Sequence, residues 1–167
     1  MYELEHQTEP YLRRLGGVSS YWSLGLLQTF LVEGRDTGGR VTLGEGLARK
    51  GTEPPPHTHT REDEAYYILE GELTFRVGGQ TIEAKPGDFV WLPRGVEHSF
   101  DLHTSQARAL VMFTPAGLEE AFKQIGEPAR SATLPPPADE PLDVQKVLTL
   151  FGTYGLQFGP PPVSPGK

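Results

Sequence analysis

The sequence predicts an all-β fold, a small antiparallel barrel or sandwich, with one or two helices after it. Between residues 21 and 115, short apolar runs alternate with turns that contain glycine. The 20 glycines and 16 prolines among 167 residues supply the many tight turns that such a fold requires. After residue 116 the apolar positions change to helical spacing. We therefore expect an N-terminal arm over residues 1–20, a β domain over 21–115, and helices, a Pro-rich linker and a tail over 116–167 that pack on it.

The elements follow in order from the apolar runs and the turn residues between them. The arm has little periodicity, and we expect only a short helix near residues 10–15. Strands are predicted over residues 27–32, 41–48, 64–69, 72–77, 80–84, 89–92, 98–102 and 107–114. The pair Gly78-Gly79 is typical of a two-residue hairpin turn. Helices are predicted over 116–125 and 142–151, joined by an extended Pro-rich linker over 127–138 and followed by an irregular tail.

Composition and charge exclude several classes of protein. A chain of 167 residues is long enough for one domain with its own core. Cysteine is absent, so disulfides, thiolate metal sites and thiol nucleophiles are excluded. The net charge of −7 argues against an extended nucleic-acid surface, and no apolar run is long enough to span a bilayer. We expect a soluble, cytoplasmic protein with no nucleic-acid or membrane partner.

Three potential metal ligands, His57, His59 and Glu64, lie within eight residues. Side chains two apart share a face of a strand, so the two histidines can point the same way. Glu64 reaches that face only if residues 60–63 form a turn, and a third imidazole, His98, comes from a later strand. Any one of these histidines alone is more simply a hydrogen-bonded core or surface residue. Three imidazoles and one carboxylate together bind a divalent ion and leave positions for water, O₂ or substrate.

The spacing of these residues resembles the two sequence motifs of the cupin superfamily. The first motif is matched by Gly51-x5-His57-x-His59-x4-Glu64-x6-Gly71, and the second by Gly87-x5-Pro93-x-Gly95-x2-His98. The asparagine that usually closes the second motif is replaced by Leu102. That asparagine is generally not a ligand, so the departure affects hydrogen bonding at the end of the barrel rather than metal binding.

The resemblance implies a jelly-roll β-barrel with one divalent metal ion inside, held by His57, His59, Glu64 and His98. Nickel, cobalt, manganese, iron and zinc all suit nitrogen and oxygen donors, so the ion's identity stays open. Glu62 and Asp63 are expected to be solvated turn residues without a ligand role.

Strand parity indicates which side chains face the expected site. Tyr66 and Ile68 share the parity of Glu64, and Phe100 shares that of His98, so these three are expected to line a substrate pocket. Plain barrel core is an equally good interpretation of most apolar and aromatic residues on these strands, and these three are the better candidates for the pocket.

Among cupins, the chain resembles single-domain bacterial proteins related to quercetin dioxygenases. The likeness rests on the segment Asp36-Thr37-Gly38-Gly39, the helix after Thr114 and the Pro-rich C-terminal part. It implies cleavage of a flavonol or a similar enol or enediol with O₂, in which Glu64 is both ligand and proton acceptor. It also implies a homodimer, since cupins commonly pair through their sheets.

Two alternatives stay open. A sugar isomerase or epimerase acting on a phosphate would need basic residues in the cavity. The basic residues in or between the motifs, which are more simply surface residues, are Arg61, Arg76, Lys85 and Arg94. The other alternative is a cupin that binds a small molecule without turnover.

Overall fold

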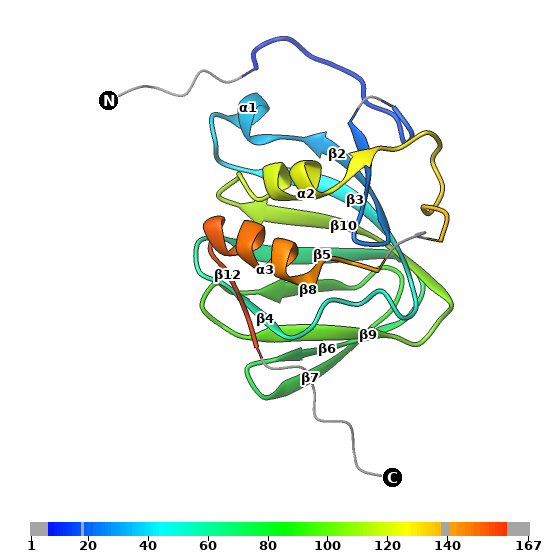
Figure 1. Cartoon of the computed structure of the whole chain (residues 1–167), viewed down its shortest axis with the longest axis vertical. Helices are drawn as coiled ribbons and strands as arrows, with labels where there is room; N and C mark the ends of the chain where they lie inside the picture. Colours follow the sequence, from blue (N-terminus) through cyan, green and yellow to red (C-terminus); the bar gives the residue numbers. More distant parts are fainter. Residues whose placement is uncertain (1–6, 18, 138–140, 160–167) are drawn as a thin grey trace.

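The computed structural model describes residues 7–17, 19–137 and 141–159, and two antiparallel β-sheets dominate them (Figure 1). The seven-stranded sheet has the order β11 (Glu127–Pro128), β1 (Ser20–Ser23), β2 (Leu26–Val32), β3 (Thr42–Arg49), β10 (Gln106–Thr114), β5 (Asp63–Glu70) and β8 (Phe89–Leu92). The five-stranded sheet has the order β12 (Leu156–Phe158), β4 (His57–His59), β9 (His98–Leu102), β6 (Leu73–Val77) and β7 (Gln80–Ala84). The described helices are α1 (Gly34–Thr37), α2 (Glu119–Ile125) and α3 (Val144–Thr153).

This arrangement confirms the predicted all-β class and fits the jelly-roll fold. Each predicted strand lies within one residue of a strand in the structure. Within the described residues the two sheets are not hydrogen-bonded into one closed barrel. The core lies between them, because alternate side chains of each strand point inward. In β9, for example, Phe100 and Leu102 are buried, whereas Asp101 between them is exposed.

A second apolar cluster lies where α2 and α3 cover the sheets (Figure 1). The rings of Phe122 in α2 and Phe151 in α3 meet edge to face with centroids 5.0 Å apart. Phe151 and Val147, one helical turn apart, are the buried residues of α3. The carboxylate of Asp143 caps this helix by accepting the backbone N–H of Lys146 at 3.0 Å. No described helix is long and apolar enough to cross a membrane.

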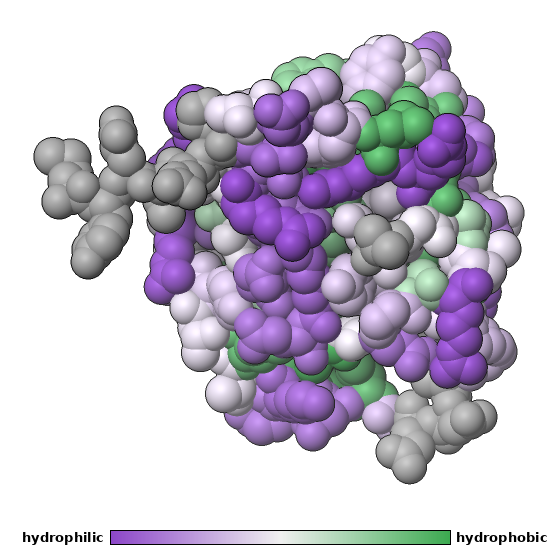
Figure 2. Space-filling view, turned by 90° about the horizontal axis from the view of Figure 1, so that it is seen from above, coloured by the Kyte–Doolittle hydropathy of each residue, from purple (hydrophilic) through white to green (hydrophobic). Residues whose placement is uncertain are grey.

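The N-terminal arm is ordered differently from the prediction. Residues 7–17 contain no helix, so the predicted helix near residues 10–15 is wrong. Instead, Tyr11 donates a hydrogen bond to the carbonyl of Leu31 at 3.0 Å, and Arg13 pairs with Asp36 at 2.9 Å. These long-range contacts outweigh weak local helix propensity. Figure 2 looks onto this end of the molecule and shows mainly hydrophilic residues, with hydrophobic ones in small patches.

The C-terminal segment also differs from the prediction. The sequence predicted no strand between the helix end at Gly152 or Gly155 and the irregular tail that begins at Gly159. In the structure, Leu156–Phe158 form β12, which pairs with β4. A three-residue strand is too short to show periodicity, and it forms here because the edge of β4 offers free hydrogen-bonding groups. Residues 1–6 and 18 of the predicted arm, 138 of the linker and 160–167 of the tail lie outside the described residues.

Candidate metal centre

The four ligands expected from the sequence come together between the two sheets. His57 and His59 lie on β4, with His98 directly opposite His57 on β9. Glu64 lies on β5, in the other sheet. The chain crosses between sheets over residues 60–62, so the odd spacing from His59 to Glu64 still brings both side chains to the interior. All four residues are buried, and one ligand atom from each lies within 4.8 Å of the others.

Two of the histidines are oriented by backbone carbonyls. Nδ1 of His57 lies 2.9 Å from the carbonyl oxygen of Pro55, and Nδ1 of His98 lies 3.0 Å from that of Val96. A carbonyl only accepts, so each Nδ1 carries the proton. In the neutral form of such an imidazole, Nε2 carries the lone pair that can bind a metal ion. Oε2 of Glu64 lies 3.1 Å from Nε2 of His98.

The charges of the cluster favour a bound cation. Burial lowers the pKa of His57 to about 4, although the charge of Glu64 opposes this. Burial also opposes a charge on His59, but the carboxylates of Glu62 and Glu64 beside it raise its pKa to about 9. Burial raises the pKa of Glu64, but the neighbouring side chains of His59 and His98 and the charge of His59 hold it well below its usual value. At pH 7, His59 therefore carries a proton in the metal-free protein, and a cation that binds to its ring nitrogen has to displace this proton.

This donor set fits a divalent metal ion. Three imidazole nitrogens and one ionised carboxylate are buried together, and buried charges in proteins are paired or coordinate metals. His57, His59, Glu64 and His98 are the residues that would hold the ion. Nitrogen and oxygen donors of this kind suit several first-row transition metals, so the set does not select one of them.

The two sequence motifs hold each other in place beside the cluster. Asp63 accepts hydrogen bonds from the backbone N–H of Arg94 at 2.9 Å and from its guanidinium. The N–H of Gly95 donates to the carbonyl of His59 at 2.8 Å.

Gly71, at the end of the first motif, has a φ of 87°, and a Cβ there would lie 2.6 Å from the carbonyl oxygen of Gln106. Only glycine fits that approach.

One residue beside the ligands differs from the sequence-based expectation. Glu62 is 4% exposed, so its assignment to a solvated turn is wrong. Its Oε2 lies 3.5 Å from Nδ1 of His59. Neither atom has a hydrogen-bond partner among the described residues. The sequence gives no indication that Glu62 is buried, because a run of four polar residues such as 60–63 is typical of an exposed turn.

A cavity of about 740 Å³ opens from the ligands. Tyr66 and Phe100 line it, as expected, whereas Ile68 is fully buried in the core and is not part of its wall. Ile68 has the expected parity, but it lies further along β5, where the sheets pack tightly. Burial and the charge of Glu64 raise the pKa of Tyr66 well above its usual value, so its hydroxyl remains a proton donor beside that carboxylate.

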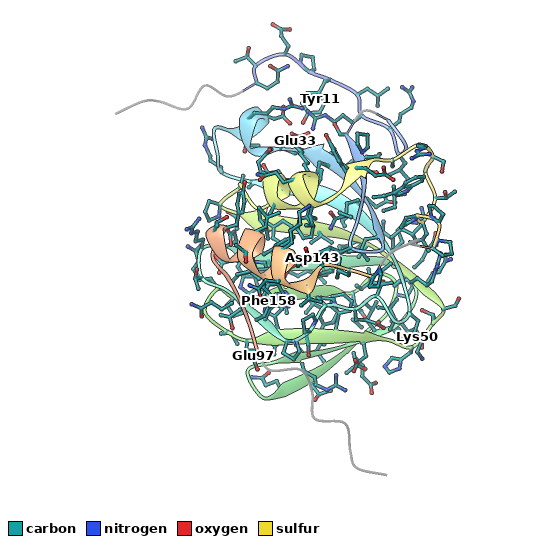
Figure 3. The ribbon with its side chains drawn as sticks, viewed as in Figure 1. Tyr11, Glu33, Lys50, Glu97, Asp143 and Phe158 are labelled. Atoms are coloured by element: carbon teal, nitrogen blue, oxygen red, sulfur yellow. The ribbon has the colours of Figure 1, made fainter. Side chains whose placement is uncertain are left out.

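Much of the cavity wall comes from residues that the sequence did not single out. Phe113 of β10 stacks on the ring of His59 with centroids 5.7 Å apart. The ring centroid of Phe158 lies 6.1 Å from that of His57. Phe158 is on β12, and Figure 3 labels its position. The C-terminal residues on the wall are Pro141, Leu142, Asp143, Lys146, Val147, Phe151, Leu156 and Phe158. The one feature of the sequence that pointed to these wall residues is the apolar face of α3, because that helix was predicted to pack on the β domain.

Comparison with known proteins agrees with this geometry. The family model described as "Cupin domain" matches residues 40–115. Quercetin 2,3-dioxygenase of Bacillus subtilis is 26% identical over 133 residues, which cover 80% of this chain and 40% of that protein. The chain spans between about a third and about half of the length of the curated relatives it matches.

Solved structures show the same fold. An RmlC-like cupin from Shewanella frigidimarina superposes with a TM-score of 0.55 at 23% identity, over 67% of this chain and 96% of that one. A predicted oxalate decarboxylase from Thermotoga maritima gives a TM-score of 0.56 at 20% identity, over 63% of this chain and 99% of that one. At these identities the likeness concerns the fold alone. The family model covers the region that contains the buried histidine and glutamate cluster, and the structure has the fold of a cupin.

Proposed function

We propose that this cupin is a metal-dependent dioxygenase that cleaves a flavonol or a similar enol or enediol with O₂. The observation that carries the proposal is the position of Glu64, an ionised carboxylate that belongs to the ligand cluster and also lines the cavity. The similarity to quercetin 2,3-dioxygenase over 80% of the chain supports the same reaction class. Mostly apolar walls with few polar groups suit a planar organic substrate.

The chain's own residues have separate roles in this reaction. A divalent ion held by the cluster would supply a Lewis acid that lowers the pKa of a substrate hydroxyl. Glu64 accepts the hydroxyl proton at Oε2, which leaves the substrate as an enolate. The aromatic rings of Phe100, Phe113 and Phe158 orient the substrate and exclude water.

The cavity gives little support to a sugar-phosphate isomerase. Among the described residues that line it, Lys146 is the only lysine or arginine. Of the basic residues considered from sequence, Arg76 pairs with Asp101 and Arg94 pairs with Asp63, and neither lines the cavity. A phosphate dianion would therefore lack the paired cations it needs.

We also propose that the protein is a homodimer. Tyr67 and Phe89 face each other on neighbouring strands, and both are exposed, at 42% and 60%. Trp91, on the same edge strand β8, is 44% exposed. Exposed aromatic residues on an edge strand support an interface there. A monomeric mass by light scattering at micromolar concentration would contradict this.

Elemental analysis followed by oxygen uptake tests the proposed reaction. Protein purified without added metal is first analysed for bound metals, then stripped and reloaded separately with nickel, cobalt, manganese or iron. Each form is given flavonols and other enediol compounds in an oxygen electrode. We expect O₂ consumption with at least one metal and none in the stripped protein. If no loaded form consumes O₂ with any of these compounds, the protein is not a dioxygenase of this class and the binding alternative gains support.

A further inference from the structure

We propose that Glu62 is a positioning residue of the metal site, which holds His59 through Nδ1 and strengthens Nε2 as an electron donor to the ion. This inference rests on the ligand cluster and not on the proposed reaction. It concerns a residue outside the ligand set, on the turn between β4 and β5.

The three histidines are held in two different ways. His57 on β4 and His98 on β9 face each other. In each of them, Nδ1 points to the backbone carbonyl of the residue two positions earlier. His59 has no such carbonyl among its hydrogen-bond partners, and the nearest acceptor to its Nδ1 is the carboxylate of Glu62. Substitutions do not remove the backbone carbonyls that contact His57 and His98. The contact to His59, in contrast, requires a glutamate side chain at position 62.

The geometry places the His59 ring between two carboxylates. Nε2 lies 3.2 Å from Oε2 of Glu64, and Nδ1 lies 3.5 Å from Oε2 of Glu62. The side chains of His59 and Glu62 are 3% and 4% exposed, so water does not compete for either atom. Two buried polar atoms that face each other and have no other partner are best explained as a pair, because leaving either alone is costly.

The turn that carries Glu62 is itself held in place. Thr60 donates from both its backbone N–H and its hydroxyl to the carbonyl of Gly155, at 3.0 and 2.8 Å. A Cβ at Gly155 would lie 2.7 Å from that hydroxyl oxygen, so the contact is close. The C-terminal segment therefore fixes the turn on which Glu62 points inward.

A carboxylate behind a ligand imidazole has a specific chemical effect. It fixes the tautomer with the proton on Nδ1, aims Nε2 at the ion and raises the basicity of Nε2. A neutral backbone carbonyl also fixes the tautomer and the direction of Nε2, but it raises the basicity of Nε2 less because it carries no full negative charge. His59 should therefore be the strongest nitrogen donor of the three, and loss of Glu62 should weaken metal binding without removing a ligand.

Zinc affinity of three variants tests this role. Metal-free wild type, Glu62→Gln, Glu62→Ala and Glu97→Gln are titrated with Zn²⁺ in competition with a chromophoric chelator. Glu97→Gln is the matched control, since it removes the same charge from an exposed residue next to the ligand His98 (Figure 3). We expect about 10- to 100-fold weaker binding for Glu62→Ala, a smaller loss for Glu62→Gln, whose amide oxygen still accepts, and wild-type affinity for the control.

A second measurement needs no variant. In the zinc-loaded wild type, long-range proton–nitrogen correlation spectra identify which ring nitrogen of each histidine carries the proton. We expect Nδ1–H in all three ligand histidines, with that of His59 shifted furthest downfield by its carboxylate partner. Equal zinc affinity of Glu62→Gln, or of a folded Glu62→Ala, and wild type would overturn the inference, as would a His59 Nδ1–H signal no further downfield than the other two. None of these readouts requires turnover, so failure of the proposed reaction would leave them unchanged.

Discussion

The polar floor of the cavity and its apolar wall are built in different ways. The floor is formed by the candidate ligands His57, His59 and Glu64, with His98 beside them. One donor atom from each of the four lies within 4.8 Å of the others. Its geometry depends on strand register and on directional hydrogen bonds. The wall draws on segments from Leu24 to Phe158 and depends on packing, which is not directional.

This difference separates two properties of the protein. A shift of a floor residue changes metal binding at once, because coordination tolerates only small changes of distance. A change in the wall alters the shape of the cavity and the stability of the fold, but leaves the donor atoms where they are. We therefore expect different substitutions to affect metal binding and the shape of the cavity.

Loss of a floor residue should have the largest effect. In His98→Ala one of three imidazoles is missing, and loss of an outer-shell partner alone typically weakens metal binding by about 10- to 100-fold. We expect a greater loss than this, such that the purified variant retains almost no metal by elemental analysis. Circular dichroism should show an unchanged fold. Retention of metal at the wild-type ratio would mean that His98 is not a ligand.

A large change in the wall should give the opposite result. Phe151 is 1% exposed and packs against Phe122, so Phe151→Ala should lower the free energy of unfolding by about 3–5 kcal/mol. Chemical denaturation measures this loss. Zinc affinity of the folded variant should equal that of wild type. A parallel loss of affinity would show that floor and wall are coupled, contrary to the separation described above.

The pH dependence of metal binding concerns the floor alone. Because the pKa of His59 is raised to about 9 in the metal-free protein, the bound proton must leave when the ion binds. Affinity should therefore rise by up to about tenfold per pH unit between pH 7 and 9, since a single proton is displaced. Calorimetric titrations in two buffers of different ionisation enthalpy measure the protons released. No release at pH 7 would contradict a protonated His59.

The smallest expected effect lies at the rim of the wall. Asp143 caps α3 and also lines the cavity, so Asp143→Ala should destabilise the protein by about 1 kcal/mol. Asp143→Asn is the matched control, because asparagine caps a helix equally well. Thermal unfolding followed by circular dichroism separates the two variants. Equal melting temperatures would show that the cap does not contribute to stability.

Sequence predicted the floor far better than the wall, for a physical reason. Fixed spacing within two motifs encodes the ligands, and the strands around them alternate regularly, as β9 shows. The wall depends on α3 and β12, which reach the ligands only through tertiary packing. Glu62 was missed for the same reason, because its burial arises where the C-terminal segment holds the turn. Ile68 shows the limit of parity, which gives the direction of a side chain but not its distance from the cavity.

We propose that Glu64 joins the floor to the rest of the cavity as both ligand and proton acceptor. Glu64→Gln keeps the shape of the side chain but loses its basicity, and turnover of metal-loaded enzyme should fall by about 100-fold or more. Turnover and metal content are measured on the same preparations of wild type and variant. We predict that Glu64→Gln, loaded to wild-type metal content, consumes almost no O₂ with a substrate that the wild type turns over. Equal metal content with undiminished turnover would mean that Glu64 is not the proton acceptor.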